Sequence, residues 1–154
     1  MFLPIVSYGS PVLRKKCENI DENYPQLEKL LDNMWKTMYN SSGVGLAAPQ
    51  INLSINVFII DTKPFVEEGD EDNSIKKVFI NATIIEEEGE EWSFNEGCLS
   101  IPDIREEVKR KSIITIKYQD ENFKWHTETF KGIAARVIQH EYDHIQGKLF
   151  IDYV

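Results

Sequence analysis

Apolar residues between positions 25 and 40 recur with the period of an amphipathic helix. They are Leu27, Leu30, Leu31, Met34, Trp35 and Met38. Residues spaced by three and four lie on one helix face, so this segment is predicted to be a helix that packs into the core. Pro25 suits the first turn of this helix, and the turn residues 41–43 end it.

Short runs of β-branched residues follow this helix and predict strands. The expected single strands are residues 56–61, 77–81 and 82–86. Residues 113–118 and 123–130 alternate apolar and polar side chains on either side of residues 119–122, which is typical of a β-hairpin. An antiparallel or mixed sheet is therefore expected.

A second helical pattern covers residues 133–146, and Gly147 is well placed to cap its C-terminus. Between the helices, residues 63–76 contain Pro64, Gly69 and several acids, which favour a solvated loop. The acidic run at residues 86–91 could be imagined as a cation site, but such runs are usually solvated faces.

Length and composition indicate one ordinary globular domain. The chain has 154 residues, 42% of them hydrophobic and 28% charged, and no apolar run is long enough to cross a bilayer. The net charge of -9 argues against tight binding to a phosphate backbone, so DNA and membranes are not expected partners. Because the first residues lack the features of a signal peptide, a cytoplasmic location is expected.

The segment His140-Glu141-Tyr142-Asp143-His144 places two imidazoles one helical turn apart. Both rings can bind one divalent ion, while Glu141 points into the same space. This HExxH pattern indicates metal-assisted hydrolysis, although it also arises by chance on amphipathic helices.

Cys98 is the candidate for a third metal ligand. A catalytic ion of this kind usually takes three protein ligands and keeps one position open, and a thiolate suits a borderline-soft metal. Cys98 follows Gly97, which allows close backbone approach, and precedes Pro102, which we expect to end any strand pairing. Taken alone, a free cysteine is more often a small buried apolar residue.

Residues 43–50 form a third segment of interest, because their small side chains allow backbone to lie against a ligand. The same residues also suit a turn followed by tight packing. Gln50 adds an amide donor that can stabilise an oxyanion if it is aimed at the reacting carbonyl.

Together these segments resemble the three motifs of peptide deformylases: residues 43–50 the first, 96–100 the second and 140–144 the third. The resemblance implies that residues 1–154 are one catalytic domain of the α+β class, with antiparallel or mixed sheets around a central metal-binding helix that carries HExxH. Cys98, His140 and His144 would be the metal ligands. Glu141 would be the general acid and base, with Gln50 and the backbone N–H of Leu99 as oxyanion donors.

The implied substrate is the formyl-methionine end of a new polypeptide, from which formate is released. Its extended backbone would bind near Gly43, Val44, Gly45 and Gly97. Ile133 and Val137 share a helix face with His140 and are expected to line the pocket for the methionine side chain, although they could equally be plain core. Arg105 is a rim candidate by resemblance, and Arg136 could shape the rim or reach solvent.

The resemblance implies ferrous iron as the native metal, while the ligand set also suits zinc, nickel or cobalt. Glu96 and Asp143 could each hold a ligand's N–H group or an arginine. Many deformylases continue into a C-terminal helix after the segment that corresponds to residues 148–154. Because this sequence stops at Val154, transient contact with the ribosome through such a helix is in doubt here.

Two other readings of the HExxH pattern stay open at this point. One is a zincin-like metallopeptidase, whose third ligand is usually a histidine or a glutamate rather than a cysteine. The other is a non-catalytic metal-binding or interaction domain. His126 has no partner at ligand spacing and is expected to occupy an ordinary strand position.

Overall fold

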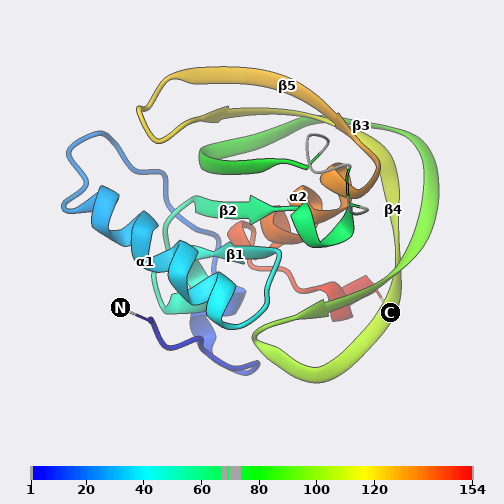
Figure 1. Cartoon of the computed structure of the whole chain (residues 1–154), viewed down its shortest axis with the longest axis horizontal. Coiled ribbons are helices and arrows are strands. Elements are labelled where there is room, and N and C mark those ends of the chain that lie inside the picture. Colours follow the sequence, from blue (N-terminus) through cyan, green and yellow to red (C-terminus); the bar gives the residue numbers. More distant parts are fainter. Residues whose placement is uncertain (1, 67–68, 70–73, 154) are drawn as a thin grey trace.

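Five antiparallel strands lie in one sheet in the same order as along the chain, β1-β2-β3-β4-β5. The computed structural model describes residues 2–66, 69 and 74–153. The strands are β1 (Gly45–Ala47), β2 (Val57–Asp61), β3 (Lys76–Cys98), β4 (Ile101–Gln119) and β5 (Trp125–Lys131). Figure 1 shows β3 and β4 as a long curved pair that bends around the helix α2 (Gly132–Ile145). The expected single α+β domain with an antiparallel sheet is confirmed.

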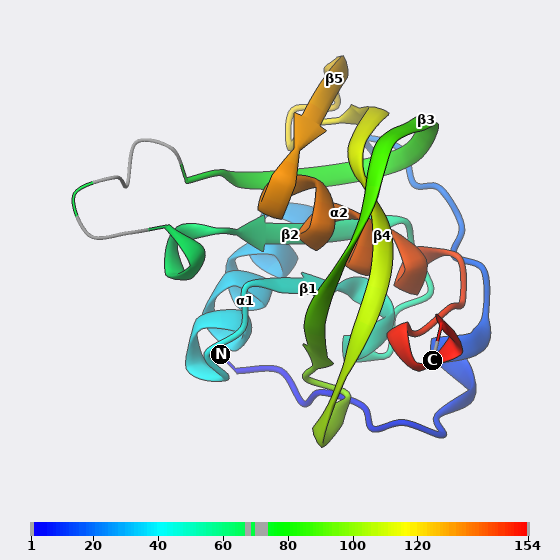
Figure 2. The same ribbon diagram turned by 90° about the vertical axis from the view of Figure 1, so that its right-hand side faces the viewer.

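Strand β2 is buried on both faces because a helix covers each side of it. Phe58 and Ile60 belong to the apolar cluster that contains α2, whereas Val57 and Ile59 belong to the cluster that contains α1 (Leu27–Asn40). Side chains alternate between the two faces of a strand, so a strand buried on both faces is apolar throughout. Figure 2 shows α1 and α2 with β1 and β2 between them.

The first predicted helix forms and packs as expected, but it starts later. Leu31, Met34 and Met38 of α1 are buried in the core. The helix begins at Leu27 because Gln26 has a left-handed backbone with φ of 55°, which a right-handed helix cannot include. Pro25 therefore lies outside the helix.

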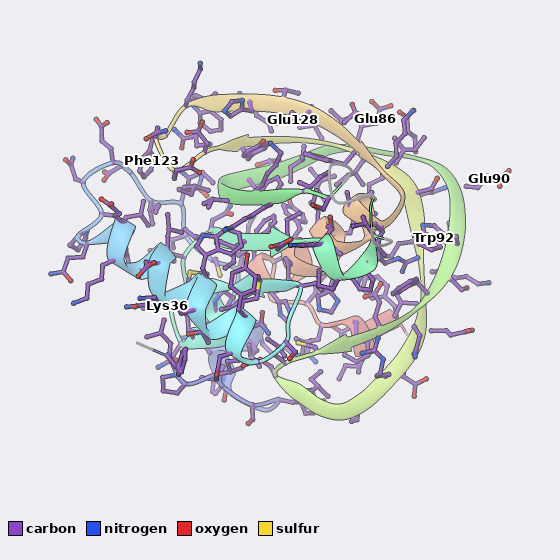
Figure 3. All side chains as sticks on the ribbon, in the orientation of Figure 1. Lys36, Glu86, Glu90, Trp92, Phe123 and Glu128 are labelled. Atoms are coloured by element: carbon purple, nitrogen blue, oxygen red, sulfur yellow. The ribbon has the colours of Figure 1, made fainter. Side chains whose placement is uncertain are left out.

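Strand β3 is one long strand where two short ones were predicted. It runs from Lys76 to Cys98 with register shifts along its pairing with β4, one of them at Gly89 between Glu88 and Glu91. The acidic residues 86–91 are exposed, as predicted, although they lie in the strand; Figure 3 shows Glu86 and Glu90 on its outer side.

The expected role of Pro102 is wrong. Strand β4 begins at Ile101 and runs through Pro102, so the proline does not end the pairing, and the chain turns at residues 99–100 instead. A proline is tolerated in the first residues of a strand where its missing N–H is not needed by the ladder.

The predicted hairpin and the second helix are confirmed. Strands β4 and β5 pair from Ile113↔Lys131 to Gln119↔Trp125. At the end of α2, Gly147 has φ of 77°, and the N–H groups of Gly147 and Lys148 donate to the carbonyl oxygens of His144 (3.1 Å) and Asp143 (2.8 Å). This is the glycine cap expected from the sequence.

Short 3-10 helices connect the main elements: η1 (Pro11–Arg14), η2 (Ala48–Ile51), η3 (Lys63–Phe65) and η5 (Phe150–Tyr153). The predicted loop at 63–76 begins with η3, and its residues 67–68 and 70–73 lie outside the described residues. Within the described chain, none of the helices has the length and apolar character required to cross a membrane.

Candidate metal centre

Cys98, His140 and His144 each contribute one potential ligand atom, and these three atoms lie within 4.8 Å of one another. Cys98 is the last residue of β3, and the two histidines lie one turn apart on α2. Cys98 Sγ is 3.4 Å from His144 Nε2. Burial lowers the pKa of His144 well below its usual value, so the ring is neutral, as a metal ligand must be. One thiol and two imidazoles are a donor set that fits a divalent metal with an open coordination position.

The tight turn between β3 and β4 brings the cysteine to the helix. Cys98 pairs with Ile101 across the two-residue turn formed by Leu99 and Ser100. On the same strand Glu96 is buried, two residues before Cys98, and therefore lies on the same face of β3.

Glu96 orients His140. Its Oε1 accepts a hydrogen bond of 2.9 Å from His140 Nδ1, which leaves the ring's other nitrogen for a metal. Burial raises the pKa of the Glu96 carboxyl, but hydrogen bonds from His140 and Arg110 outweigh it and hold the pKa well below the usual range. Glu96 therefore stays ionised and fixes the orientation of the imidazole.

Arg110 is a site residue that sequence reasoning missed. Its Nε and Nη2 donate to the two oxygens of Glu96 at 2.7 and 2.9 Å, and its Nη1 donates to Asp143 Oδ2 at 2.7 Å. Glu96 and Asp143 thus both bind Arg110, and Glu96 also binds the candidate ligand His140. The signal was available in the alternation of Val108 and Arg110, both buried, on either side of the exposed Lys109.

Glu141 is buried beside the cluster, with its Oε2 3.9 Å from His140 Nε2. Burial raises the pKa of its carboxyl to about 7, so it can exchange a proton near neutral pH. Among the residues that the structure describes, its Oε1 has no hydrogen-bond partner, although that atom is covered. A carboxylate with a free acceptor oxygen beside the three candidate ligands suits the role of general acid and base.

The amide of Gln50 is held with its nitrogen toward the cluster. Its Oε1 accepts a 3.0 Å hydrogen bond from the Ala47 N–H, and its Nε2 lies 3.4 Å from Cys98 Sγ and 3.3 Å from Ser100 Oγ. The side chain is almost fully buried. Gln50 therefore offers a preorganised donor rather than lying at the surface.

A cavity of about 600 Å³ opens beside these groups. Its lining includes the following sequence-predicted residues: Gly43, Val44, Gly45, Gln50, Gly97, Cys98, Leu99, Arg105, Ile133, Val137, His140 and Glu141. Phe65 and Phe94 also line it, and no sequence signal marked them. Strand β1 ends the sheet order, so its outer edge has no partner strand in the described part of the chain. An extended peptide can pair with such an edge.

The two arginines considered from the sequence differ in position. Arg105 is exposed at the rim, where its Nη2 donates to the carbonyl oxygen of Asn95 at 2.9 Å. The expectation that Arg136 could reach solvent is wrong: it is only 2% exposed and donates to Glu96 Oε2 at 2.6 Å. The buried carboxylate offsets the cost of burying this charge. His126 pairs with Asp120 in the hairpin, at 2.7 Å.

Comparisons with known proteins agree on one family. The family model for polypeptide deformylase matches residues 2–154. The peptide deformylases of Christiangramia forsetii and Cytophaga hutchinsonii are 58% and 48% identical to the chain. Their alignments cover 99% and 100% of this chain and 81% and 83% of the relatives.

Solved structures show the same likeness. The peptide deformylase of Thermotoga maritima aligns with a TM-score of 0.88 at 37% identity, covering 100% of this chain and 98% of the other. A Met-Ala-Ser-bound class I type b peptide deformylase from Acinetobacter baumannii aligns with a TM-score of 0.88 at 32% identity. The alignment covers 100% of this chain and 99% of the other.

Proposed function

Because this chain belongs to the polypeptide deformylase family, we propose that Cys98, His140 and His144 hold one divalent metal and that residues 1–154 are a catalytic domain around it. The enzyme removes the N-terminal formyl group from the formyl-methionine of nascent polypeptides. The observation that carries the site assignment is the convergence of the three ligand atoms, with Cys98 and His140 lining the same cavity as Glu141. The HExxH helix α2 is then the central metal-binding helix.

A metal at this cluster supplies Lewis-acid polarisation and makes water a competent nucleophile near neutral pH. We assign ferrous iron as the native ion, and the same donors also suit zinc, nickel and cobalt. A thiolate ligand to ferrous iron is prone to oxidation, so the iron form is expected to lose activity in air while the zinc or nickel form retains it.

Glu141 moves the proton in this mechanism. Its carboxylate accepts a proton from the water whose oxygen attacks the formyl carbon. When the carbon–nitrogen bond breaks, Glu141 delivers that proton to the leaving amine, and formate departs. A pKa of about 7 lets the same group act as base and then as acid.

Two donors meet the negative charge that develops on the formyl oxygen. They are Nε2 of Gln50 and the backbone N–H of Leu99, and both residues line the cavity. Fixed donors aimed at a developing charge cost no reorganisation during the reaction.

The peptide binds between two backbone edges, each of which is paired with a neighbouring strand on one side only within the described chain. Gly43, Val44 and Gly45 lie at and before the outer edge of β1, and Gly97 lies opposite near the end of β3. Ile133 and Val137 line the part of the cavity assigned to the first side chain, with Arg105 at the rim. The Acinetobacter baumannii relative binds Met-Ala-Ser, and a peptide of this kind is proposed to occupy the cavity here. A contact with the ribosome is proposed to be transient.

The test is formate release from formyl-Met-Ala-Ser by the metal-loaded enzyme under anaerobic conditions. Glu141→Gln should abolish formate release while retaining the metal, and Cys98→Ala should lose metal affinity. Glu90→Gln, at an exposed position on β3, is the matched control and should behave as wild type. Cleavage of an internally cleavable blocked peptide instead would indicate a zincin-like peptidase. Metal binding with neither activity would indicate a non-catalytic domain.

A further inference from the structure

Phe150 packs against the ring of the candidate metal ligand His140. The two ring centroids are 6.0 Å apart and the ring planes are inclined by 28°, which is an offset stack. Phe150 is 1% exposed and belongs to η5, the short helix that follows α2. Figure 1 shows this red segment, near the C-terminus, beside the pair of strands β3 and β4. The chain after α2 thus returns to the candidate metal centre and packs on one face of the His140 ring.

Two contacts of different kinds act on the His140 ring. The 2.9 Å hydrogen bond from Nδ1 to Glu96 Oε1 fixes the direction of one ring edge. A single hydrogen bond tolerates a range of angles, so by itself it allows the ring plane to tilt. Phe150 opposes that tilt, because a flat ring packed against the imidazole leaves it no room to turn in a close-packed interior. Glu96 and Phe150 together therefore decide where Nε2, the nitrogen left for a metal, points.

The packing around Phe150 also reaches the thiol. Four buried apolar side chains form one small cluster, and Cys98 packs against it; the four are Ile101, Val108, Leu149 and Phe150. Cys98 ends β3, whereas His140 lies on α2. One apolar cluster therefore supports a candidate ligand from the sheet and, through Phe150, a candidate ligand from the helix.

The segment that carries Phe150 is itself held in place. Oδ2 of Asp152 accepts hydrogen bonds from the Leu149 N–H at 3.0 Å and from Nη1 of Arg14 at 2.7 Å. The Asp152 N–H donates to the carbonyl oxygen of Leu149 at 3.0 Å. Since η5 is tied both to itself and to η1, it presents Phe150 in one position.

We propose that Phe150 is a positioning residue for metal binding, which holds the plane of the His140 ring so that Nε2 and the thiol of Cys98 can bind one ion. Within the described chain, Phe150 is not among the residues that line the substrate cavity, so its effect passes through the ligand and not through the peptide. The inference rests on the proposed function, because it needs Cys98, His140 and His144 to hold a metal.

The experiment loads the protein with cobalt(II), which reports on its own coordination. A thiolate ligand gives a sulfur-to-cobalt charge-transfer band, and the d–d bands report the geometry of the donors around the ion. The spectrum and the cobalt affinity, the latter by competition with a chelator, are measured anaerobically for the wild-type protein, Phe150→Leu and Phe79→Leu. The temperature is one at which urea unfolding shows each variant to be folded.

Phe79→Leu is the matched control. Phe79 is 0% exposed and belongs to a different apolar cluster. Its ring partners are Phe58, Tyr118 and Phe130, none of which is a candidate ligand. The same substitution there removes a buried ring from the core without removing one from the metal centre.

Phe150→Leu should weaken cobalt binding about 10-fold, the lower end of the usual effect of losing a group that orients a ligand. Its d–d bands should shift, while the charge-transfer band remains because Cys98 still binds. Phe79→Leu should unfold at lower urea concentration but keep the wild-type affinity and bands. If Phe150→Leu does not fold, Phe150→Met, which fills similar volume with a flexible chain, takes its place.

Unchanged affinity or unchanged d–d bands in the Phe150 variant would overturn this inference alone, as would the same changes in Phe79→Leu. Absence of the charge-transfer band from the cobalt-loaded wild-type protein would overturn the proposed metal centre and the inference with it.

Discussion

The carboxylate of Glu141 packs directly against the backbone of Gly45. A Cβ placed on Gly45 would lie 2.5 Å from Glu141 Oε2 and 2.8 Å from its Cδ. No heavy atom tolerates that contact, so the carboxylate occupies the space that only glycine leaves open. The glycine in strand β1 thus makes room for the carboxylate of Glu141.

Gly45→Ala should therefore displace Glu141 and lower kcat about 100-fold, because a shift of about 1 Å in a catalytic group costs that much. Metal content and thermal stability report whether the effect is local. The metal should be retained, since the nearest atoms to the new Cβ all belong to Glu141 and none to Cys98, His140 or His144. A kcat close to wild type would mean that Glu141 works equally well elsewhere.

Gln50→Glu separates the two roles of this side chain. It keeps the oxygen that accepts from the Ala47 N–H and removes the donor that faces Cys98 and Ser100. We expect turnover to fall about 100-fold to 1000-fold, the usual effect of losing an oxyanion donor. Gln50→Ala should lose a similar factor in turnover and, in addition, about 1 kcal/mol of stability for the lost Ala47 bond. Normal formate release by the Glu variant would exclude Gln50 as a donor.

Arg110→Met should destabilise the metal-free protein by about 3–5 kcal/mol, because it leaves Asp143 buried without its cation and Glu96 with Arg136 alone. Urea denaturation in the presence of a chelator measures this loss. Metal affinity should fall about 10-fold to 100-fold as His140 loses its fixed orientation, which competition with a chromophoric chelator detects. A variant as stable as wild type would show that water or rearrangement satisfies both carboxylates.

Gly147→Ala should lower the free energy of unfolding for two reasons. The left-handed backbone costs about 1–2 kcal/mol with any side chain, and the new Cβ would meet the Arg14 carbonyl oxygen at 2.6 Å. Gly132→Ala is the matched control, since its φ is 61° and nothing lies within 4 Å of its Cβ position. Equal destabilisation of the two variants in urea would mean that the contact with Arg14 is relieved at no cost.

The sequence predicted the cluster of candidate metal ligands better than the groups that support it. Cys98, His140, Glu141 and His144 carry chemistry in their residue types, and the structure brings them together. Arg110 could not be placed, because charged residues on a strand usually face water, and only the alternation with Val108 distinguishes it. Its burial depends on Glu96 and Asp143, which come from distant parts of the chain.

Helices were predicted to within a few residues, whereas the length of β3 was not. Gly89 and the glutamates around it are poor strand formers, so the sequence pattern predicted that the strand would end near residue 86. Pairing with β4 overrides that preference, and the register shift at Gly89 absorbs the irregularity.

The order of the sheet also decides when the metal can first be held. Cys98 emerges during synthesis before β4, β5 and α2 exist, and both histidines come from the last of these. A partly synthesised chain therefore has only one of the three candidate ligands, Cys98. Metal uptake must follow the closing of the β4–β5 hairpin and the docking of α2, so the bound ion stabilises only the finished fold. The three candidate ligands come together only in a chain in which β4, β5 and α2 have been made and docked.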